Sequence, residues 1–398
     1  FILIGLVGSS MSGSKVSKRI DQYVLRGKLR QEGFERWRYV FSAFNKLTGD
    51  ERIFFVELYI VNPGISPKAA VLSQKSRLAL SESDLQYALA GTASAAHAND
   101  ELEVMPSYVL VKAGVFGANG KHMNKFLASN QFTFVRNSET FKAGDCLFGP
   151  ASLSGTVLVS PQDLRVKPEL LCNAGAMSWD LKYDRQIESG PMYNRKKTVW
   201  MPVGLKVLFS GSVTLDGQEY IVIPKNACGY IDKSWGEKPK SPYFHVSSVK
   251  LISLITGKPM FNSCFALEGE FGGKLCASIV MDGVRYSIEN RKIFRKNAII
   301  HDCSQITDSI EGDKVHWTVS IHKGKFVIDI DLYCKGNQMF VRDYEMPQGK
   351  RTLLKVLGGC GSGEIRVYKK IKKNLELLEH ASVRDAICEF GQSEEVGK

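Results

Sequence analysis

The chain is dominated by short runs in which large apolar residues alternate with smaller or polar ones. Residues 37–44 and 52–61 are rich in aromatic and β-branched side chains, and residues 45–50 between them contain Asn, Gly and Asp. This alternation has the period of a strand, so the two runs predict a β-hairpin. Further strands are expected at residues 107–115, 131–135, 155–159, 176–183, 316–322, 325–332, 338–343 and 363–369.

Two other segments carry a stronger hairpin signal. Residues 206–223 place Asp216-Gly217 between two β-rich runs, and residues 278–288 place Asp282-Gly283 in the same way. An Asp-Gly pair tolerates the positive φ angles that a tight two-residue turn requires. The two units align at an offset of 66 residues. This offset reflects either two β-domains built from similar hairpins or the coincidence of a common hairpin pattern.

Helical signals are scarce. Residues 373–389 place Leu375, Leu378 and Val383 among charged positions, which predicts an amphipathic C-terminal helix. The glycine-rich residues 358–363 lead into an expected strand, so they predict a tight turn; a phosphate-binding loop would need a following helix. Many short strands with Gly and Asp turns indicate a mainly β protein built of barrels or sandwiches.

The length of the chain indicates how many domains it can form, and its net charge limits the kinds of partner it can have. Its 398 residues are enough for about two domains that each bury a core. It carries 53 Lys and Arg against 41 Asp and Glu, a formal net charge of +12. This surplus is compatible with a polyanionic partner, an anionic membrane surface, or solubility alone. Basic residues are frequent between residues 13 and 38, so we expect residues 1–30 to form a basic leader that is solvated or drawn to an anionic surface.

The first residues and the cysteines bear on location. Residues 1–8 are apolar but too few to cross a bilayer, which takes roughly 20 residues. We expect residues 1–10 to be upstream sequence, with a remnant of a secretory or anchor segment as the alternative. The nine cysteines lack metal-site spacing, which predicts buried thiols in a reducing compartment. These features favour a cytoplasmic protein, with peripheral association with a membrane left open.

Common catalytic signatures are absent: the chain has no GxSxG, GxxxxGK[ST] or HExxH motif, and its seven histidines are scattered. We therefore expect no metal site and no cofactor. The segment that carries chemistry is residues 226–236, which places Tyr230, Asp232, Lys233 and Trp235 within six residues. In an apolar barrel, an acid beside aromatic faces can protonate an alkene and stabilise the developing cation.

Strand geometry restrains this interpretation. On a regular strand Tyr230 and Asp232 face one way, whereas Lys233 and Trp235 face the other. Asp232 and Trp235 would share a ligand only if the chain bends, as it could at Gly236. The structural alternative is that Asp232 forms an ion pair or a turn bond and that Trp235 closes the end of a barrel.

The same segment resembles a family pattern. Gly229-Tyr-Ile-Asp-Lys-Ser-Trp-Gly236 is similar to the aromatic-x-Asp-basic-x-Trp-Gly signature of the tocopherol cyclase-like family, and carotenoid 1,2-hydratases carry a similar element. Other segments resemble family elements in the same order: residues 33–39 an early Tyr-x-Glu-Gly-Trp-Tyr element, residues 176–183 a central Trp-Asp-Leu strand, residues 208–217 a Gly-x-Val hairpin, and residues 363–368 a closing strand.

The resemblance implies two lipocalin-like antiparallel β-barrel domains, residues 31–240 and 241–398, with the helix at the end of the second. Enzymes among the relatives cyclise or hydrate isoprenoid alkenes by protonation. Carried over to this sequence, Asp232 would be the proton donor or an orienting acid. The residues expected to bind the ligand are Tyr230, Trp235, Trp179, Trp37, Glu35 and Lys233.

Two positions depart from the resembled pattern. Arg36 stands where the family usually has Gly, and Tyr243-Phe-His-Val246 stands where relatives often carry Trp-x-Trp. A less aromatic wall indicates a different apolar ligand or a loss of catalysis.

Two functions remain open at this point. One is an enzyme that cyclises, hydrates or isomerises a prenylated or polyene substrate without a metal or nucleotide. The other is a non-catalytic carrier or sensor of a lipid, quinone or isoprenoid. We do not expect a nucleic-acid partner, because the Lys and Arg residues are dispersed and no recognised nucleic-acid-binding module is present.

Overall fold

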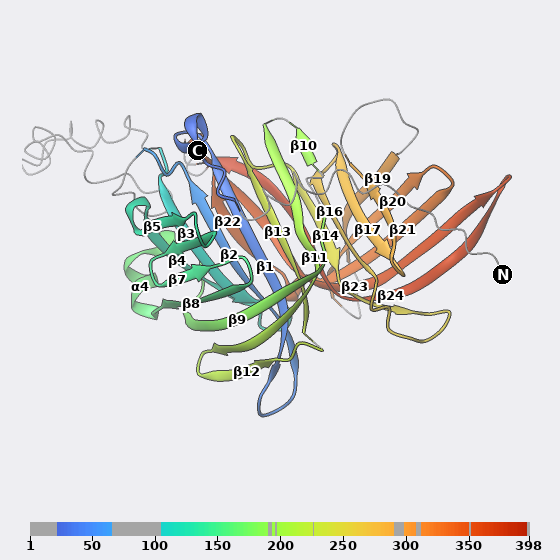
Figure 1. Ribbon diagram of the computed structural model, residues 1–398, viewed down its shortest axis with the longest axis horizontal. Helices are drawn as coiled ribbons and strands as arrows, with labels where there is room; N and C mark the ends of the chain where they lie inside the picture. The colour runs from blue at the N-terminus through green and yellow to red at the C-terminus, as the bar shows by residue number, and fades with distance from the viewer. Residues whose placement is uncertain are drawn as a thin grey trace, which may run out of the picture.

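The computed structural model describes residues 22–65, 105–189, 193–195, 197–225, 227–289, 298–307, 312–349 and 352–395. Within them the chain folds into antiparallel strands in two sheets, one of 13 strands and one of 11 (Figure 1). The sheets form a barrel and a half-barrel, each around its own hydrophobic core. The expected mainly β fold, with two antiparallel barrel-like domains, is confirmed.

The first sheet holds the described strands up to residue 236. They pair in the order β4-β3-β2-β1-β12-β11-β9-β8-β7-β6-β5, with β10 beside β11 and with β13 beside both β1 and β11. Their bounds are β1 (Phe34–Asn45), β2 (Glu51–Val61), β3 (Tyr108–Val115), β4 (Lys121–Ala128), β5 (Phe132–Val135), β6 (Thr140–Ala143), β7 (Cys146–Phe148), β8 (Ser152–Val159), β9 (Gly175–Ile187), β10 (Tyr193–Arg195), β11 (Thr198–Leu215), β12 (Gln218–Val222) and β13 (Cys228–Gly236). The helical pieces of this half are η1 (Gly27–Arg30), η3 (Ser129–Gln131), α4 (Pro161–Val166) and η4 (Pro168–Leu170).

The second sheet holds the described strands from residue 243 onward. They pair in the order β18-β17-β16-β14-β24-β23-β21-β20-β19, with β15 beside β24 and β22 beside β23. Their bounds are β14 (Tyr243–Ser248), β15 (Lys250–Ser253), β16 (Cys264–Glu270), β17 (Leu275–Met281), β18 (Val284–Ile288), β19 (Ala298–Ile306), β20 (Lys314–Lys323), β21 (Phe326–Lys335), β22 (Phe340–Glu345), β23 (Thr352–Ile371) and β24 (Asn374–Glu395), with η5 (Gly336–Gln338) before β22. The chain passes between the two sheets at residues 237–242.

The two Asp-Gly turns form as expected. Asp216 and Gly217 join β11 to β12, and Asp282 and Gly283 join β17 to β18. The φ angles are 49° and 81° in the first turn and 47° and 81° in the second. Positive φ at both central positions is the geometry of a tight hairpin turn, so these two residues set the register of each hairpin.

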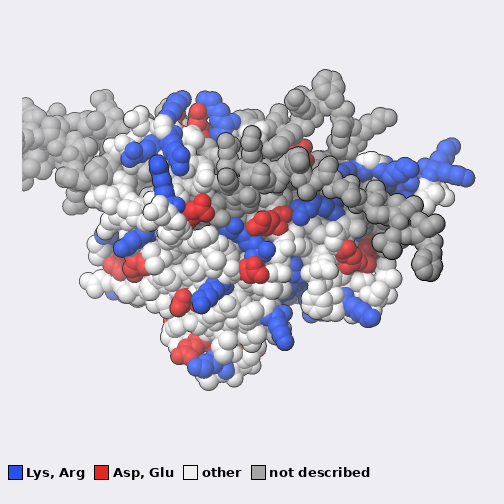
Figure 2. All heavy atoms as spheres, in the orientation of Figure 1, with Lys and Arg blue, Asp and Glu red and all other residues white. Residues whose placement is uncertain are grey.

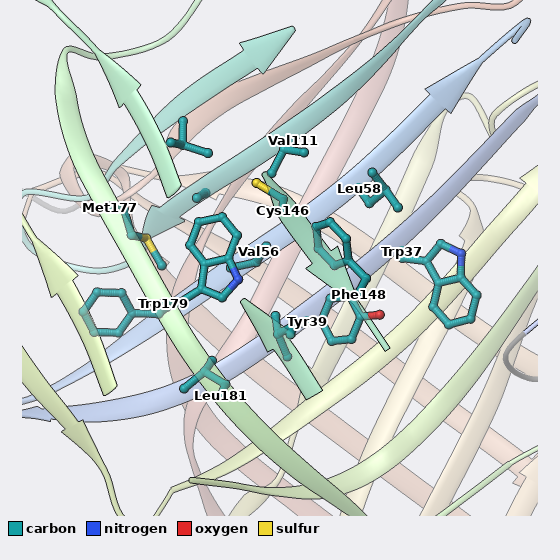
Figure 3. Packing of buried hydrophobic residues seen from close by; sticks show 14 of the residues in the cluster. Trp37, Tyr39, Val56, Leu58, Val111, Cys146, Phe148, Met177, Trp179 and Leu181 are labelled. Atoms are coloured by element: carbon teal, nitrogen blue, oxygen red, sulfur yellow. The ribbon is translucent and has the colours of Figure 1, made fainter. Parts of the chain in front are cut away.

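Alternate strand residues fill the interior of the first barrel. On β1, Trp37, Tyr39 and Phe41 belong to the core. Figure 3 shows Trp37 and Tyr39 packed with Phe148 of β7 and Trp179 of β9. Because successive strand residues point to opposite faces, the even-numbered residues of β1 point away from this core and toward the second domain.

The expected C-terminal helix is wrong, because residues 374–395 form strand β24, which pairs with β23 over most of its length. Two β-bulges explain the misleading pattern. One extra residue lies on β24 between Leu377 and Glu379, and another lies between Val383 and Ala386. Each bulge moves the apolar residues that follow by one position. A strand of period 2 thereby acquires the irregular apolar spacing of an amphipathic helix.

The glycine-rich residues 358–363 do not form the expected tight turn; they lie in the middle of β23. A Cβ atom at Gly363 would lie 1.9 Å from the backbone oxygen of Asp331, and one at Gly361 would lie 2.6 Å from that of Tyr333. Both oxygens belong to β21. The glycines therefore allow β21 to approach β23 closely.

The two sheets pack against each other through two apolar clusters. One includes Phe55 and Trp200 of the first sheet with Ala266 of the second, and the other includes Tyr59 and Tyr344. On β2, Phe55 and Tyr59 flank Glu57 on the same face of the strand. The charged side chain of Glu57 therefore lies between the two apolar clusters of the interface.

Three other expectations concern the rest of the chain. All nine cysteines lie within the described residues, where none forms a disulfide bond and each is buried or partly buried. The expected basic leader lies outside the described residues up to residue 21. Among the residues described, no helix has both the length and the apolar character needed to cross a membrane.

The packing of β23 on β21 predicts that Gly363→Ala is destabilising. The added methyl group collides with the Asp331 carbonyl, so the free energy of unfolding should fall by about 1–3 kcal/mol. Gly149→Ala is the control, since a Cβ atom there meets only contacts of 3.4 Å or more. Urea unfolding followed by tryptophan fluorescence measures both variants. Equal stabilities would contradict the strand assignment.

Candidate functional site

A row of four charged side chains crosses the outer face of the first barrel. Asp232 on β13, Arg38 on β1, Glu57 on β2 and Lys112 on β3 are register neighbours in that order. Each is 0% exposed. The signs of the charges alternate along the row, so neighbouring strands place opposite charges side by side.

The second domain presents a matching row. His245 on β14 is the register neighbour of Glu268 on β16 and of Glu389 on β24, and all three are fully buried, as is Arg342 on β22. We refer to the buried charged and histidine side chains from both rows, with two further cations beside them, as the interdomain cluster. It comprises Arg36, Arg38, Glu57, Lys112, Asp232, Lys240, His245, Glu268, Arg342 and Glu389.

Arg38 ties the two rows together. Its Nη2 atom lies 2.5 Å from Oδ2 of Asp232 in its own domain, and its Nη1 atom lies 2.6 Å from Oε2 of Glu389 in the other. Nη2 also lies 3.0 Å from Nε2 of His245. Burial opposes the charge of Arg38, but Asp232 and Glu389 outweigh it and raise its pKa. The guanidinium is thus a permanent cation shared by both domains.

Arg342 bridges the domains in the opposite direction. Its Nη1 atom donates to Oε1 of Glu57 at 2.7 Å, and its Nη2 atom donates to Oε1 of Glu389. The hydroxyl group of Tyr344 donates to the other oxygen of Glu57. Burial would raise the pKa of Glu389, but Arg342 and Arg38 together lower it. Glu389 is therefore a carboxylate that accepts from two arginines, one from each domain.

Glu268 is compensated by several groups at once. Lys240 Nζ lies 2.6 Å from Oε1, and Tyr243 donates to Oε2 at 3.0 Å. Burial would raise the pKa of Glu268, but Lys240, His245 and Arg36 lower it well below its usual range. The carboxylate therefore keeps its charge although it is fully buried.

The two oxygen atoms of Asp232 are partnered unequally. Oδ2 accepts from Arg38 at 2.5 Å, from the Tyr230 hydroxyl at 3.1 Å and from Trp200 Nε1 at 3.2 Å. Oδ1 accepts no hydrogen bond from the described residues, and Arg36 Nη2 is 3.9 Å away. A buried acceptor without a donor is uncommon and costly. Oδ1 is therefore a buried acceptor oxygen at which a proton or a ligand donor fits.

Neutral aromatic groups surround Asp232. The His245 ring centroid lies 5.8 Å from that of Tyr230 and 6.4 Å from that of Trp200. Burial lowers the pKa of His245, and Arg38 lowers it further, so the imidazole is neutral at pH 7. Burial raises the pKa of Tyr230, as does Asp232, so the phenol keeps its proton. The carboxyl group thus lies among uncharged rings and two guanidinium groups, with Arg38 bonded to Oδ2 and Arg36 3.9 Å from Oδ1.

Asp232, His245 and Glu268 offer ligand atoms within 4.8 Å of one another, which is a donor set that a metal ion could use. Their surroundings do not fit a cation. Arg36 Nη2 lies 3.9 Å from Oδ1 of Asp232 and 3.5 Å from Oε2 of Glu268. Arg38 is bonded to Asp232. Two guanidinium groups already neutralise these carboxylates and would repel a metal ion.

Two cavities bear on ligand size. A cavity of about 20 Å³ adjoins the cluster and is lined in part by Arg36, Glu268 and Tyr344; it has room for about one water molecule. A cavity of about 890 Å³ lies over β20, β21, β23 and β24, and its lining includes Tyr333 and Arg366. The larger cavity shares no lining residue with the interdomain cluster. Among the described residues Asp232 is 0% exposed, and the cavity beside the cluster is too small for a large ligand.

Of the residues expected to bind a ligand with Asp232, Tyr230 alone lies beside it. The other five lie inside the first barrel or at its end, on the opposite faces of their strands: Trp37, Trp179, Glu35, Lys233 and Trp235. Figure 3 shows Trp37 and Trp179 within the hydrophobic core. Strand β13 pairs with β1 without a bulge through this segment. Its faces therefore alternate, and the structure does not bring these five residues together with Asp232.

Glu35 and Lys233 form a separate buried pair in the first barrel. Lys233 Nζ lies 3.0 Å from Oε1 of Glu35, and Trp37 Nε1 donates to the same oxygen at 2.9 Å. The ammonium group lies 4.4 Å from the ring centroid of Trp37 and 5.1 Å from that of Trp235. The backbone amide of Val24 donates to the other oxygen of Glu35. These contacts fasten the segment before β1 to the barrel.

Comparison with known proteins gives a distant structural likeness. No family model matches the chain, and no curated protein sequence matches it. A protein from Nitrosomonas europaea described as an AttH has a similar structure, with 9% identity, a TM-score of 0.40, and coverage of 88% of this chain and 92% of its own. Kievitone hydratase from Nectria haematococca shows 10% identity, a TM-score of 0.40, and coverage of 89% and 88%. These values are too low to assign a family or to transfer an activity.

Sequence reasoning missed most of the interdomain cluster. The cluster residues not singled out were Arg38, Glu57, Lys112, Lys240, Glu268, Arg342 and Glu389, and the neighbouring Trp200 was not singled out either. The available signal was a lone charge within an apolar run, as at Glu57 in residues 53–61 and at Lys112 in residues 108–115. The two departures from the resembled family pattern also lie at the interdomain cluster. Their residues Arg36, Tyr243 and His245 all contact Glu268.

Removing the shared cation tests the cluster as a structural lock. Arg38→Met leaves Asp232 and Glu389 without their common partner, so the free energy of unfolding should fall by about 3–5 kcal/mol. Lys46→Met is the matched control, because it removes one partner of the exposed Lys46–Glu219 pair, and no measurable change is expected. Chemical denaturation compares the two variants. Similar losses of unfolding free energy in both variants would show that the buried ion pairs of Arg38 stabilise the protein no more than an exposed pair does.

Lys112 gives the cluster a pH dependence. Burial lowers the pKa of Lys112 from 10.5 to about 8. Between these values the unfolded chain binds more protons at this position than the folded protein does, so stability rises with pH, by up to about 3 kcal/mol. Lys112→Met should lack this rise while Glu57 keeps its bond to Arg342. Urea unfolding measured from pH 7 to about 10.5 compares the two slopes; identical slopes would contradict the assignment.

Proposed function

We propose that this protein binds an unsaturated apolar ligand against the interdomain cluster and transfers a proton at Asp232, which makes it a hydratase, cyclase or isomerase of a prenylated or polyene substrate. The observation that carries the proposal is the unequal partnering of the Asp232 oxygens. Because three donors occupy Oδ2, a proton on this side chain belongs on Oδ1.

Protonation of an alkene requires an acid whose conjugate base is stabilised, since a carbon–carbon double bond is a weak base. When Oδ1 gives its proton to one alkene carbon, the π bond breaks, a C–H bond forms and a cation develops on the neighbouring carbon. The donors on Oδ2 stabilise the carboxylate that is left. The π faces of Tyr230 and Trp200 favour a positive charge close to them.

Three outcomes return the proton to Asp232. In a hydration, water adds to the cation and loses a proton to Oδ1. In a cyclisation, a hydroxyl group of the substrate adds in the same way and closes a ring. In an isomerisation, a neighbouring C–H bond gives its proton to Oδ1 and the double bond moves. Each route balances without an oxidant or a reductant.

Substrate binding requires movement at the interface. The cavity beside the cluster holds about 20 Å³, and Tyr344 and Leu354 are among the residues that line it. Both also belong to an apolar cluster that joins the two domains. A prenyl group can reach Asp232 from this side only when such side chains move, so we place substrate access here.

Asp232→Asn tests the proposal. The wild-type protein is incubated in D₂O with a panel of prenylated phenols and linear polyenes, and the products are analysed by mass spectrometry. We expect a product with one carbon-bound deuterium, formed at least about 100-fold more slowly by Asp232→Asn. Ligand affinity, measured by tryptophan fluorescence, should change little. Asp180→Asn on the exposed face of β9 is the control and should keep full activity.

Two outcomes would contradict an enzymatic role at Asp232. Turnover by Asp232→Asn at the wild-type rate would remove this residue from the chemistry. A ligand that binds tightly and is recovered without deuterium would instead identify a non-catalytic carrier or sensor.

A further inference from the structure

The end of the β23–β24 hairpin projects from the second domain (Figure 1). Strand β21 pairs with β23 only as far as Lys369, and β15 pairs with β24 only as far as Ala381. Beyond these points the two strands pair with each other, and one backbone bond joins Lys370 to Lys325. We refer to residues 369–378 as the hairpin tip. Among the described residues, residues 369–378 are accordingly all exposed.

The hairpin tip concentrates positive charge. It contains four lysines, Lys369, Lys370, Lys372 and Lys373, and a single acidic residue, Glu376. All four lysines are exposed. In the part of the chain that the structure describes, none of them forms an ion pair. Figure 2 shows Lys and Arg side chains covering the projecting end of this hairpin.

The hairpin tip also exposes aliphatic side chains. The exposed fractions are 46% for Ile371, 53% for Leu375, 44% for Leu377 and 41% for Leu378. Single exposed aliphatic residues are ordinary on protein surfaces, but four within eight residues of a projecting hairpin mark an interaction site. The tip therefore combines lysines that form no ion pair among the described residues with apolar side chains that the described fold covers only in part.

An anionic lipid surface explains both features. Lysines on an exposed edge can serve to prevent strand-to-strand aggregation, but that purpose would not require exposed leucines. A single-stranded nucleic acid would use the lysines, but it would stack its bases on aromatic rings, and residues 369–378 contain none. Lysines near an anionic bilayer contribute about 1 kcal/mol each. Aliphatic side chains beside them bury themselves at the boundary between headgroups and acyl chains.

We propose that the hairpin tip docks the protein on an anionic membrane surface, with Lys369, Lys370, Lys372 and Lys373 facing the lipid headgroups and the aliphatic side chains entering the interface. The proposal rests on the hairpin alone and requires no catalytic activity. It also gives an apolar ligand a membrane as its source.

Vesicle binding tests the proposal on the full chain. Vesicles of phosphatidylcholine with about 30% phosphatidylserine are compared with vesicles of pure phosphatidylcholine in a flotation assay. The tip variant replaces the four lysines by glutamine: K369Q, K370Q, K372Q and K373Q. The matched control removes the same charge from exposed lysines of the first domain: K142Q, K167Q, K182Q and K225Q. A second tip variant, I371S with L375S, keeps every charge.

We expect the wild-type protein and the control to bind the anionic vesicles with similar affinity and to bind the neutral vesicles weakly. The lysine variant should bind at least about tenfold more weakly, and the serine variant should also bind more weakly. Added salt should weaken wild-type binding, because the attraction is electrostatic.

Each contrary outcome would overturn the proposal. Wild-type protein that binds neither kind of vesicle would refute it, as would a lysine variant that binds like the control. Retention of a single-stranded oligonucleotide through the tip lysines, without vesicle binding, would assign the surface to nucleic acid. None of these measurements depends on Asp232 or on a substrate, so the result is separate from that of the proposed function.

Discussion

Charges buried between the two domains are tolerated only where each one meets its opposite, and Arg38 is the group on which this condition depends. Moving one ion out of water costs several kcal/mol even after the protein relaxes. Arg38 recovers that cost by bonding Asp232 within its own sheet and Glu389 across the interface. Arg342 makes the reciprocal bridge from the second domain to Glu57. The domains therefore have one arrangement in which every carboxylate is matched.

The same compensation gives Asp232 its chemical character. Its Oδ2 atom is committed to the network, whereas Oδ1 is left with no donor among the described residues. In a network where Glu57, Glu268 and Glu389 each accept from donors on both oxygens, this oxygen is the exception. The proposed proton transfer would use the unpartnered Oδ1 atom while Oδ2 stays hydrogen-bonded, so little reorganisation would accompany each step.

Local features of the chain were predictable and distant pairings were not. The Asp216-Gly217 turn and the opposite faces of Asp232 and Lys233 follow from neighbouring residues alone. Arg38 and Glu389, in contrast, are 351 positions apart, and their meeting depends on how two separate sheets pack. The helix expected near residue 380 failed for a related reason: bulges alter the apolar spacing, and pairing with β23 decides where they occur.

The bulge on β24 between Val383 and Ala386 has a consequence for how this strand can vary. Before the bulge the core receives Ala381 and Val383, and after it the core receives Ala386 and Cys388. The extra residue thus reverses which face of the strand the following residues occupy. As a result, Glu389 points to the partner domain. If the same residues continued as a regular strand without the bulge, Asp385, Ile387 and Glu389 would point into the core and Cys388 would point to the partner domain. Substitutions that prevent the bulge from forming would therefore reverse the facing of every later residue of β24, whereas deletion of the extra residue would preserve it.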